Sequence, residues 1–137
     1  EGNEVTLASF RGQKLVMYFY PMDDTPGCTK QACSLRDHNA EIKAKGAAIL
    51  GVSTHDETPH QKFTAKFKLN FPLLADKGGN VAKAYGAMGS GGLFSVAKSL
   101  AGIADRVTFI IDEQGRIAHV LDKPETADHA QEVLALL

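Results

Sequence analysis

The chain has 137 residues, of which 15 are basic and 16 acidic, giving a formal net charge of −1. This length suits one domain with its own core, and the absence of a basic block argues against nucleic-acid binding. Its longest apolar stretches fall far short of the roughly 20 residues that span a bilayer, and no cleavable signal is visible. We therefore expect a cytoplasmic protein without a membrane partner, although Glu1 is not a methionine and an upstream segment could have been removed.

The first half of the chain predicts strands that alternate with helices. Residues 14–20 are almost wholly apolar, which is typical of a strand covered on both faces, and a helical pattern follows to about Lys45. The pattern then predicts a buried strand at 47–53, an amphipathic helix at 59–69, a short strand at 71–76 and a short helix at 80–87.

The second half predicts a long loop at 88–102, a β-hairpin of 106–112 and 116–122 around EQG, and a final helix within 126–137. Strands that alternate with helices predict the α/β class, with a central mixed sheet between helices, parallel pairs first and an antiparallel pair at the end. No linker or repeat is visible, so residues 1–137 are expected to form a single domain.

Cys28 and Cys33 are the only cysteines in the chain. Two cysteines are too few for a disulfide-rich scaffold. By spacing alone they could form a redox couple, half of a metal site or a structural disulfide, or they could be two unrelated buried thiols. Five residues along an ideal helix separate Cα atoms by about 8.7 Å, whereas a disulfide needs them within about 7 Å. A bond between them would therefore require the helix to unwind, which predicts a transient bond.

Cys28 follows a helix-start signal, because Asp24 or Thr25 can cap the helix and Pro26 suits its first position. In the first turn, unpaired backbone N–H groups and the helix dipole stabilise a thiolate. Gly27 leaves room for a close approach to the backbone. The signal favours a reactive sulfur that is open to solvent at the rim of a helical stripe, rather than a purely structural cysteine. That stripe comprises positions 28, 32, 35, 39 and 42.

PMDDTPGC fits the Pro-x-x-x-Thr-x-x-Cys signature of the peroxiredoxins through Pro21, Thr25 and Cys28. The longer YFYPMDDTPGCTKQACSLRD resembles the Q-type subfamily, also called bacterioferritin-comigratory proteins, in which a second cysteine often lies five residues after the first. GVST, FPLLAD and RVTFIIDEQGRIAHV extend the resemblance over nearly the whole chain. The sequence departs from the family in two places. The segment before the first strand is short, so the N-terminal edge would be truncated, and residues 89–105 lack the expected Tyr-Gly-Lys pattern.

The resemblance implies a thioredoxin-like fold and a thiol-dependent peroxidase acting on hydrogen peroxide and organic hydroperoxides. Cys28 would be the peroxidatic cysteine and Cys33 the resolving one, joined in an intramolecular disulfide that thioredoxin reduces. Thr25 and Arg106 would contact the peroxide and Pro21 would shield the thiolate. Gln31 stands where many relatives carry Glu or Gln. Gly27 would line the substrate site, no cofactor or metal is expected, and relatives of this type are often monomers.

Other classes of function fit parts of the pattern. A zinc site would join both cysteines to histidines, but a five-residue spacing differs from the short gaps usual for zinc. A disulfide carrier of the thioredoxin kind would use Cys-x-x-Cys, and a non-enzymatic interaction domain would leave the placement of Cys28 unexplained. Surface or capping roles are expected for all five histidines, which are His38, His55, His60, His119 and His129.

Overall fold

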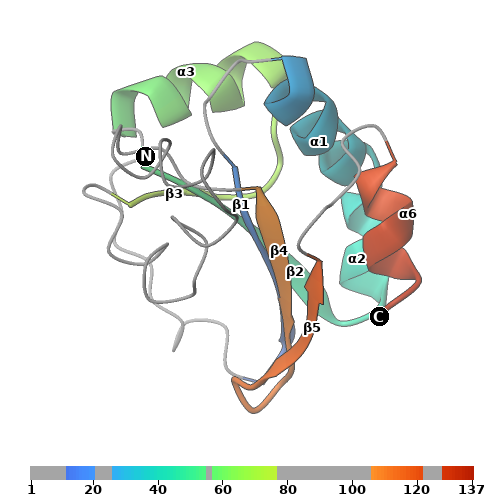
Figure 1. The fold of residues 1–137 in the computed structure, drawn as a ribbon. Helices are drawn as coiled ribbons and strands as arrows, with labels where there is room; N and C mark the ends of the chain where they lie inside the picture. The colour runs from blue at the N-terminus through green and yellow to red at the C-terminus, as the bar shows by residue number, and fades with distance from the viewer. Residues whose placement is uncertain (1–11, 21–25, 55–56, 77–105, 122–127) are drawn as a thin grey trace, which may run out of the picture.

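The structure is a computed structural model that describes residues 12–20, 26–54, 57–76, 106–121 and 128–137 (Figure 1). The predicted helix at 80–87, the loop at 88–102 and the expected site residues Pro21 and Thr25 lie outside these ranges. The described strands are β1 (Lys14–Phe19), β2 (Ala47–Ser53), β3 (Leu73–Ala75), β4 (Val107–Ile111) and β5 (Ile117–Leu121). The described helices are α1 (Pro26–Asp37), α2 (Asn39–Ala44), α3 (Glu57–Phe67) and α6 (His129–Leu134).

The five strands form one sheet in the order β3-β2-β1-β4-β5. β1 is parallel to β2 and β2 to β3, whereas β4 runs antiparallel to both β1 and β5. Each parallel pair is joined through helices, as crossover connections require. These pairings confirm the predicted α/β fold with a mixed sheet, its parallel pairs first and its antiparallel pair at the end.

Alternate residues of the central strands feed two buried apolar clusters, one on each face of the sheet. The helix-side cluster joins strand residues such as Val16, Tyr18 and Ile110 to residues from all four described helices, and Figure 1 shows α1, α2 and α6 together on one side of the sheet. The far-side cluster consists, within the described ranges, of strand residues only: Leu15, Met17, Phe19, Leu50, Val52, Val107, Phe109 and Ile111. The prediction of helices on both faces is thus confirmed for one face.

The predicted hairpin is confirmed, and its turn is built around Asp112. Asp112 Oδ1 accepts hydrogen bonds from the backbone N–H groups of Gln114 and Arg116, at 3.0 and 2.9 Å. Gly115 has a φ of 84°, a left-handed conformation that glycine adopts without strain. The residue types in this turn therefore account for the reversal between β4 and β5.

The helical pattern predicted to about Lys45 is confirmed, but the chain breaks at His38, so that the pattern is divided into α1 and α2. His38 has a φ of −112° and a ψ of 11°, and its Nδ1 lies 3.0 Å from the carbonyl oxygen of Ser34. In a continuous helix this carbonyl oxygen would accept a hydrogen bond from the backbone N–H of residue 38. Here the His38 ring contacts it. The buried stripe nevertheless persists across the break, since positions 28, 32, 35, 39 and 42 are all buried.

None of the helices in the described ranges is long and apolar enough to cross a membrane.

Candidate active site

The sheet topology brings Arg106 to the start of α1. Because β1 and β4 are antiparallel and Phe19 pairs with Val107, the end of β1 lies beside the beginning of β4. Arg106 directly precedes β4, and the chain leaving β1 reaches α1 at Pro26. Two segments that are far apart in sequence therefore meet at one point.

The Arg106 guanidinium contacts two side chains of α1. Its Nη2 donates a hydrogen bond to Cys28 Sγ at 3.4 Å, and its Nη1 donates one to Gln31 Oε1 at 2.7 Å. Cys28 and Gln31 are three residues apart, so they lie on one face of the helix. The shorter hydrogen bond, to Gln31, therefore holds the Arg106 guanidinium next to the Cys28 thiol.

The expectation that the Cys28 sulfur is open to solvent is wrong, because Cys28 is only 1% exposed. Its position on the apolar stripe places it against the helix-side cluster, with Ala32 and Leu35. Cys33 is partly exposed, and both cysteines are free thiols. The thiol is therefore covered, yet it is not enclosed by hydrocarbon alone, since the guanidinium reaches it.

Gln31 has a larger place in this site than its sequence signal suggested. Its side chain is fully buried, its oxygen accepts from Arg106, and its Nε2 has no hydrogen-bond partner within the described structure. A buried donor without a partner is costly. The site thus holds an available N–H donor next to the guanidinium. Gly27, the other α1 residue expected here, is half-buried beside Cys28.

His129 was expected to have a surface or capping role, and the structure corrects this, because its ring is fully buried against the sheet. Its Nδ1 lies 3.1 Å from Glu132 Oε1 and its Nε2 2.9 Å from Thr108 Oγ1. A carboxylate can only accept, so Nδ1–H donates to Glu132 and the Thr108 hydroxyl donates to Nε2 of the neutral ring. The spacing of one turn before the buried Val133 is the sequence signal that places this ring inward.

Burial is the main cause that lowers the pKa of His129 from its ordinary value. The hydrogen bond and the charge of Glu132 act in the opposite direction, and the positive charge of Arg106 adds to the lowering. The imidazole is therefore neutral near pH 7. Thr108 belongs to β4, which Arg106 directly precedes, so His129 connects α6 to the strand next to the guanidinium.

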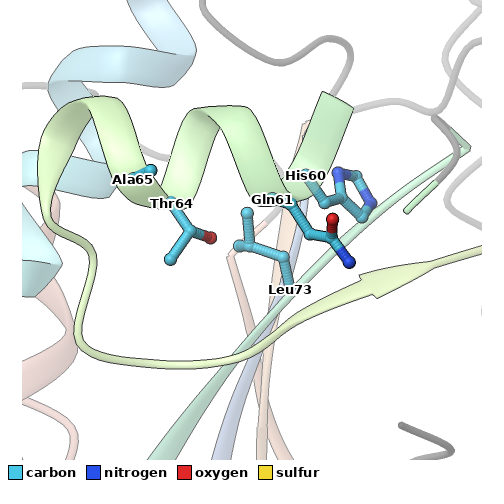
Figure 2. Close-up of a pocket in the computed structure, with 5 residues that line it drawn as sticks. All are labelled: His60, Gln61, Thr64, Ala65 and Leu73. Atoms are coloured by element: carbon cyan, nitrogen blue, oxygen red, sulfur yellow. The ribbon is translucent and has the colours of Figure 1, made fainter. Parts of the chain in front are cut away.

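A small pocket lies between α3 and β3 and contains neither thiol nor guanidinium. Figure 2 shows its lining residues His60, Gln61, Thr64, Ala65 and Leu73. His60 is buried as well, which corrects its expected surface role, and its Nε2 lies 3.0 Å from the carbonyl oxygen of Leu74. Within the described ranges, no group of three or more His, Cys, Asp or Glu side chains could hold a metal ion.

Comparisons with known proteins show the family to which the chain belongs. A profile of the AhpC/TSA family matches residues 1–120. The chain is 41% identical over 134 residues to "Peroxiredoxin Bcp" of Escherichia coli strain K12, covering 98% of this chain and 84% of that protein. It is 37% identical over 138 residues to "Peroxiredoxin Q, chloroplastic" of Oryza sativa subsp. japonica, covering 100% of this chain and 60% of that protein.

Among solved structures, the bacterioferritin comigratory protein of Xanthomonas campestris superposes with a TM-score of 0.87 at 31% identity, covering 99% of this chain and 84% of that chain. The sheet order and flanking helices described above are accordingly those of the thioredoxin-like fold. With family, sequence and fold in agreement, the chain belongs to the AhpC/TSA family and, within it, to the peroxiredoxins of the Bcp and Q type, oxidoreductases that reduce peroxides with thiols.

Proposed function

We propose that this chain reduces hydrogen peroxide and organic hydroperoxides at Cys28, that Cys33 resolves the oxidised cysteine, and that thioredoxin restores both thiols. The observation that carries the proposal is the contact of 3.4 Å between the Arg106 guanidinium and Cys28 Sγ. Of the two thiols, only Cys28 accepts a hydrogen bond from a cationic side chain within the described residues. This difference supports Cys28, rather than Cys33, as the nucleophile.

In the first step, the Cys28 thiolate attacks one peroxide oxygen. A sulfur–oxygen bond forms, the O–O bond breaks, and the second oxygen leaves as water or an alcohol after taking up a proton, which leaves a sulfenic acid. Negative charge develops on the leaving oxygen, and donors aimed at it lower the barrier. Arg106 and the unpaired Nε2 of Gln31 supply such donors. By resemblance to the family, the Thr25 hydroxyl also contacts the peroxide, and Pro21 shields the thiolate.

In the second step, the Cys33 thiol attacks the sulfenic sulfur, so that a disulfide forms and a water molecule leaves. In the reduced chain both cysteines belong to the uninterrupted helix α1, and ideal helical spacing holds their Cα atoms about 8.7 Å apart. Resolution therefore requires part of α1 to unwind. A dithiol such as thioredoxin then reduces the bond by exchange. Because both thiols belong to one helix, the cycle needs no second subunit, which supports a monomeric enzyme.

The test is rapid-mixing oxidation with hydrogen peroxide, followed by the intact mass of the product. We expect the reduced chain to lose two hydrogens without forming a dimer. Cys28→Ser should not react, whereas Cys33→Ser should stop at a sulfenic acid that dimedone traps. A disulfide between two chains, or full activity in Cys28→Ser, would overturn the proposal. Insulin reduction by the chain in the absence of peroxide turnover would instead favour a disulfide carrier.

A further inference from the structure

Two successive residues at the start of α6 connect the two elements that supply the thiol and the guanidinium. His129 Nε2 accepts a hydrogen bond of 2.9 Å from the Thr108 hydroxyl on β4. The backbone N–H of Ala130 donates a hydrogen bond of 3.0 Å to Ser34 Oγ on α1. All four residues that make these two bonds are buried. The helix α6 therefore bridges the helix that carries the thiol and the strand next to the guanidinium.

The bridge reaches the same side of α1 as the active site. Cys28, Gln31 and Ser34 follow one another at intervals of three residues, so they form one row along the helix. Arg106 bonds to the first two members of this row, and Ala130 bonds to the third. The contacts therefore close into a ring, which runs from the guanidinium through β4, α6 and α1 and back to the guanidinium.

The bond between Thr108 and His129 has a fixed direction. Glu132 Oε1 lies 3.1 Å from His129 Nδ1, so this nitrogen carries the proton and Nε2 is left as the acceptor. The Thr108 hydroxyl must then donate, which holds its side chain toward α6. Tyr18 is the β1 residue paired with Thr108, and the centroid of its ring lies 6.4 Å from that of the His129 ring. The imidazole is therefore fixed at both nitrogens and packed against the sheet.

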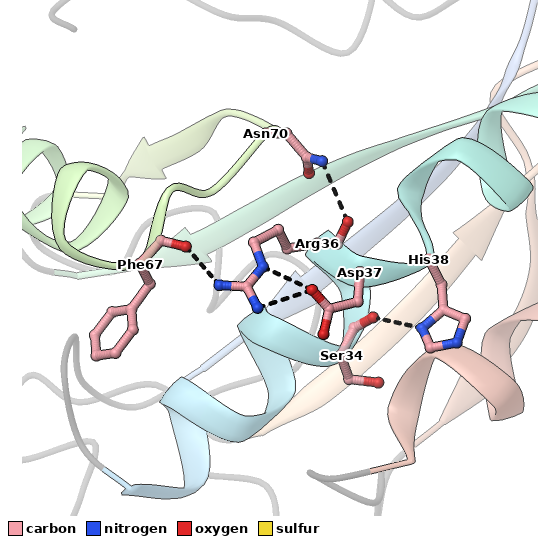
Figure 3. Close-up of polar contacts among 6 residues, drawn as sticks. All are labelled: Ser34, Arg36, Asp37, His38, Phe67 and Asn70. Atoms are coloured by element: carbon pink, nitrogen blue, oxygen red, sulfur yellow. Dashed lines mark hydrogen bonds and ion pairs between the residues drawn. The ribbon is translucent and has the colours of Figure 1, made fainter.

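The bond from Ala130 to Ser34 gives α6 a support on α1. The Ala130 amide belongs to the first turn of α6, where a backbone N–H has no partner within its own helix, and leaving such a buried donor unpaired is costly. The end of α1 that carries Ser34 is held in turn, as Figure 3 shows. His38 Nδ1 contacts the Ser34 carbonyl oxygen at 3.0 Å, and Arg36 Nη1 donates to the Phe67 carbonyl oxygen at 2.7 Å. From this support, α6 holds β4 at a constant distance from α1.

We propose that Thr108 and His129 are positioning residues for peroxide reduction, which act through α6 to set the distance between the Arg106 guanidinium and the Cys28 sulfur. Within the described residues, Arg106 reaches α1 by two side-chain hydrogen bonds, and the one to sulfur is 3.4 Å long. A donor that stabilises charge on the leaving oxygen must be held to within about 0.5 Å. The bond between Thr108 and His129 holds the backbone next to Arg106 to that precision. This inference rests on the proposed function.

The experiment measures the rate constant for loss of the reduced chain after rapid mixing with hydrogen peroxide, with acid quenching and intact mass. Thr108→Val keeps the shape of the side chain and removes the hydroxyl donor. We expect it to lower the rate constant by about tenfold, since a misplacement of about 1 Å can cost about 10²-fold. The loss should persist at higher pH. Thr108→Ser, which keeps the hydroxyl, should react at the parent rate, and an equal loss in both variants would overturn the inference.

A double variant shows whether Thr108 acts through Arg106. In an Arg106→Lys background the guanidinium is absent, so its placement no longer matters. Thr108→Val should therefore cause no further loss there, because two residues that act through one contact are not additive. If Thr108→Val lowers the rate constant by the same factor in both backgrounds, its effect does not pass through Arg106 and the inference is wrong.

Ile111→Val is the matched control for the stability of β4. It shortens a buried side chain of the same strand, at the end distant from Arg106 and on the face of the sheet opposite to α6. Its rate constant should equal that of the parent chain. A loss as large as that of Thr108→Val would show that loosening the strand is enough, which would overturn the inference. Should Thr108→Val not fold, Ser34→Ala removes the other bond of α6 and should show the same loss and the same dependence on Arg106.

The two hypotheses fail separately in these experiments. If Cys28→Ser consumes peroxide at the parent rate, the proposed function fails. If Cys28→Ser is inactive and Thr108→Val reacts as fast as the parent chain, only the positioning role of Thr108 and His129 fails.

Discussion

Arg106 contacts a sulfur and an amide oxygen on one helix turn, which requires two nitrogens in a fixed planar arrangement. Lysine keeps the charge but has a single nitrogen on a flexible stem. We therefore expect Arg106→Lys to lower the rate constant for oxidation by hydrogen peroxide by about 10²-fold, measured by rapid mixing. Arg116→Lys, on the exposed hairpin, should leave the rate unchanged. A loss that higher pH fully restores would show that Arg106 only promotes ionisation of the thiol.

His129 predicts a pH dependence of stability. Its pKa is lowered in the folded chain from 6.5, so below pH 6.5 the unfolded chain binds a proton that the folded chain does not. The free energy of unfolding should therefore fall as the pH drops from about 7, by at most about 1.4 kcal/mol per pH unit. Urea unfolding at several pH values gives the free energy of unfolding as a function of pH. Below pH 6.5 this free energy should change less steeply with pH in His129→Gln than in His119→Gln, whose ring is exposed. Equal slopes in the two variants would contradict the assignment.

At the scale of elements, the predicted strand at 47–53 has the same first and last residues as β2. A continuous apolar run between polar residues is a strong signal for a strand. The break between α1 and α2 was not predictable in the same way. It depends on a contact between the His38 ring and a carbonyl one turn earlier and on the Asn39–Asn70 hydrogen bonds. The helical pattern of apolar residues continues through it unchanged.

The packing of the Leu73 and Tyr18 side chains over β2 depends on Gly51. A Cβ at this position would lie 2.7 Å from Leu73 Cδ2 and 3.1 Å from Tyr18 Cε1 and Cζ. The Leu73 end can move, but the buried Tyr18 ring has little room, so Gly51→Ala should destabilise the chain by about 1–3 kcal/mol in urea unfolding. Leu73→Ala should relieve part of the clash, so the double variant should cost less than the two single variants together. Strictly additive costs would show that the two side chains do not compete for this space.

The two apolar clusters are contributed by alternate residues of the same central strands, for example Val16 and Met17 of β1. Neither face of the sheet can lose its packing without disturbing strands that the other face needs. We therefore expect one cooperative unfolding transition. Near-UV circular dichroism of the tyrosines and far-UV circular dichroism of the backbone should give the same urea midpoint. Two separate midpoints would mean that the faces unfold independently.

For the whole molecule, the order of elements and the mixed sheet follow from hydrophobic period and turn residues, which are local signals. The site does not follow in this way. The contact between Arg106 and Cys28 depends on which strands are neighbours, and strand order is set by the packing of the complete sheet. Resemblance to a family supplied Arg106, while the hydrogen bonds of Gln31 and His129 needed coordinates. The helix-start signal predicts where α1 begins, but it carries no information about which other segments pack over Cys28. The burial of Cys28 therefore could not be predicted from it.

That burial has a practical consequence for labelling studies. Cys28 is covered while Cys33 is partly accessible, so a bulky alkylating reagent should modify Cys33 at once and Cys28 only when the helix opens. The lag between the two adducts then measures how often opening occurs, and the same cover would exclude large electrophiles that could poison the thiol between turnovers.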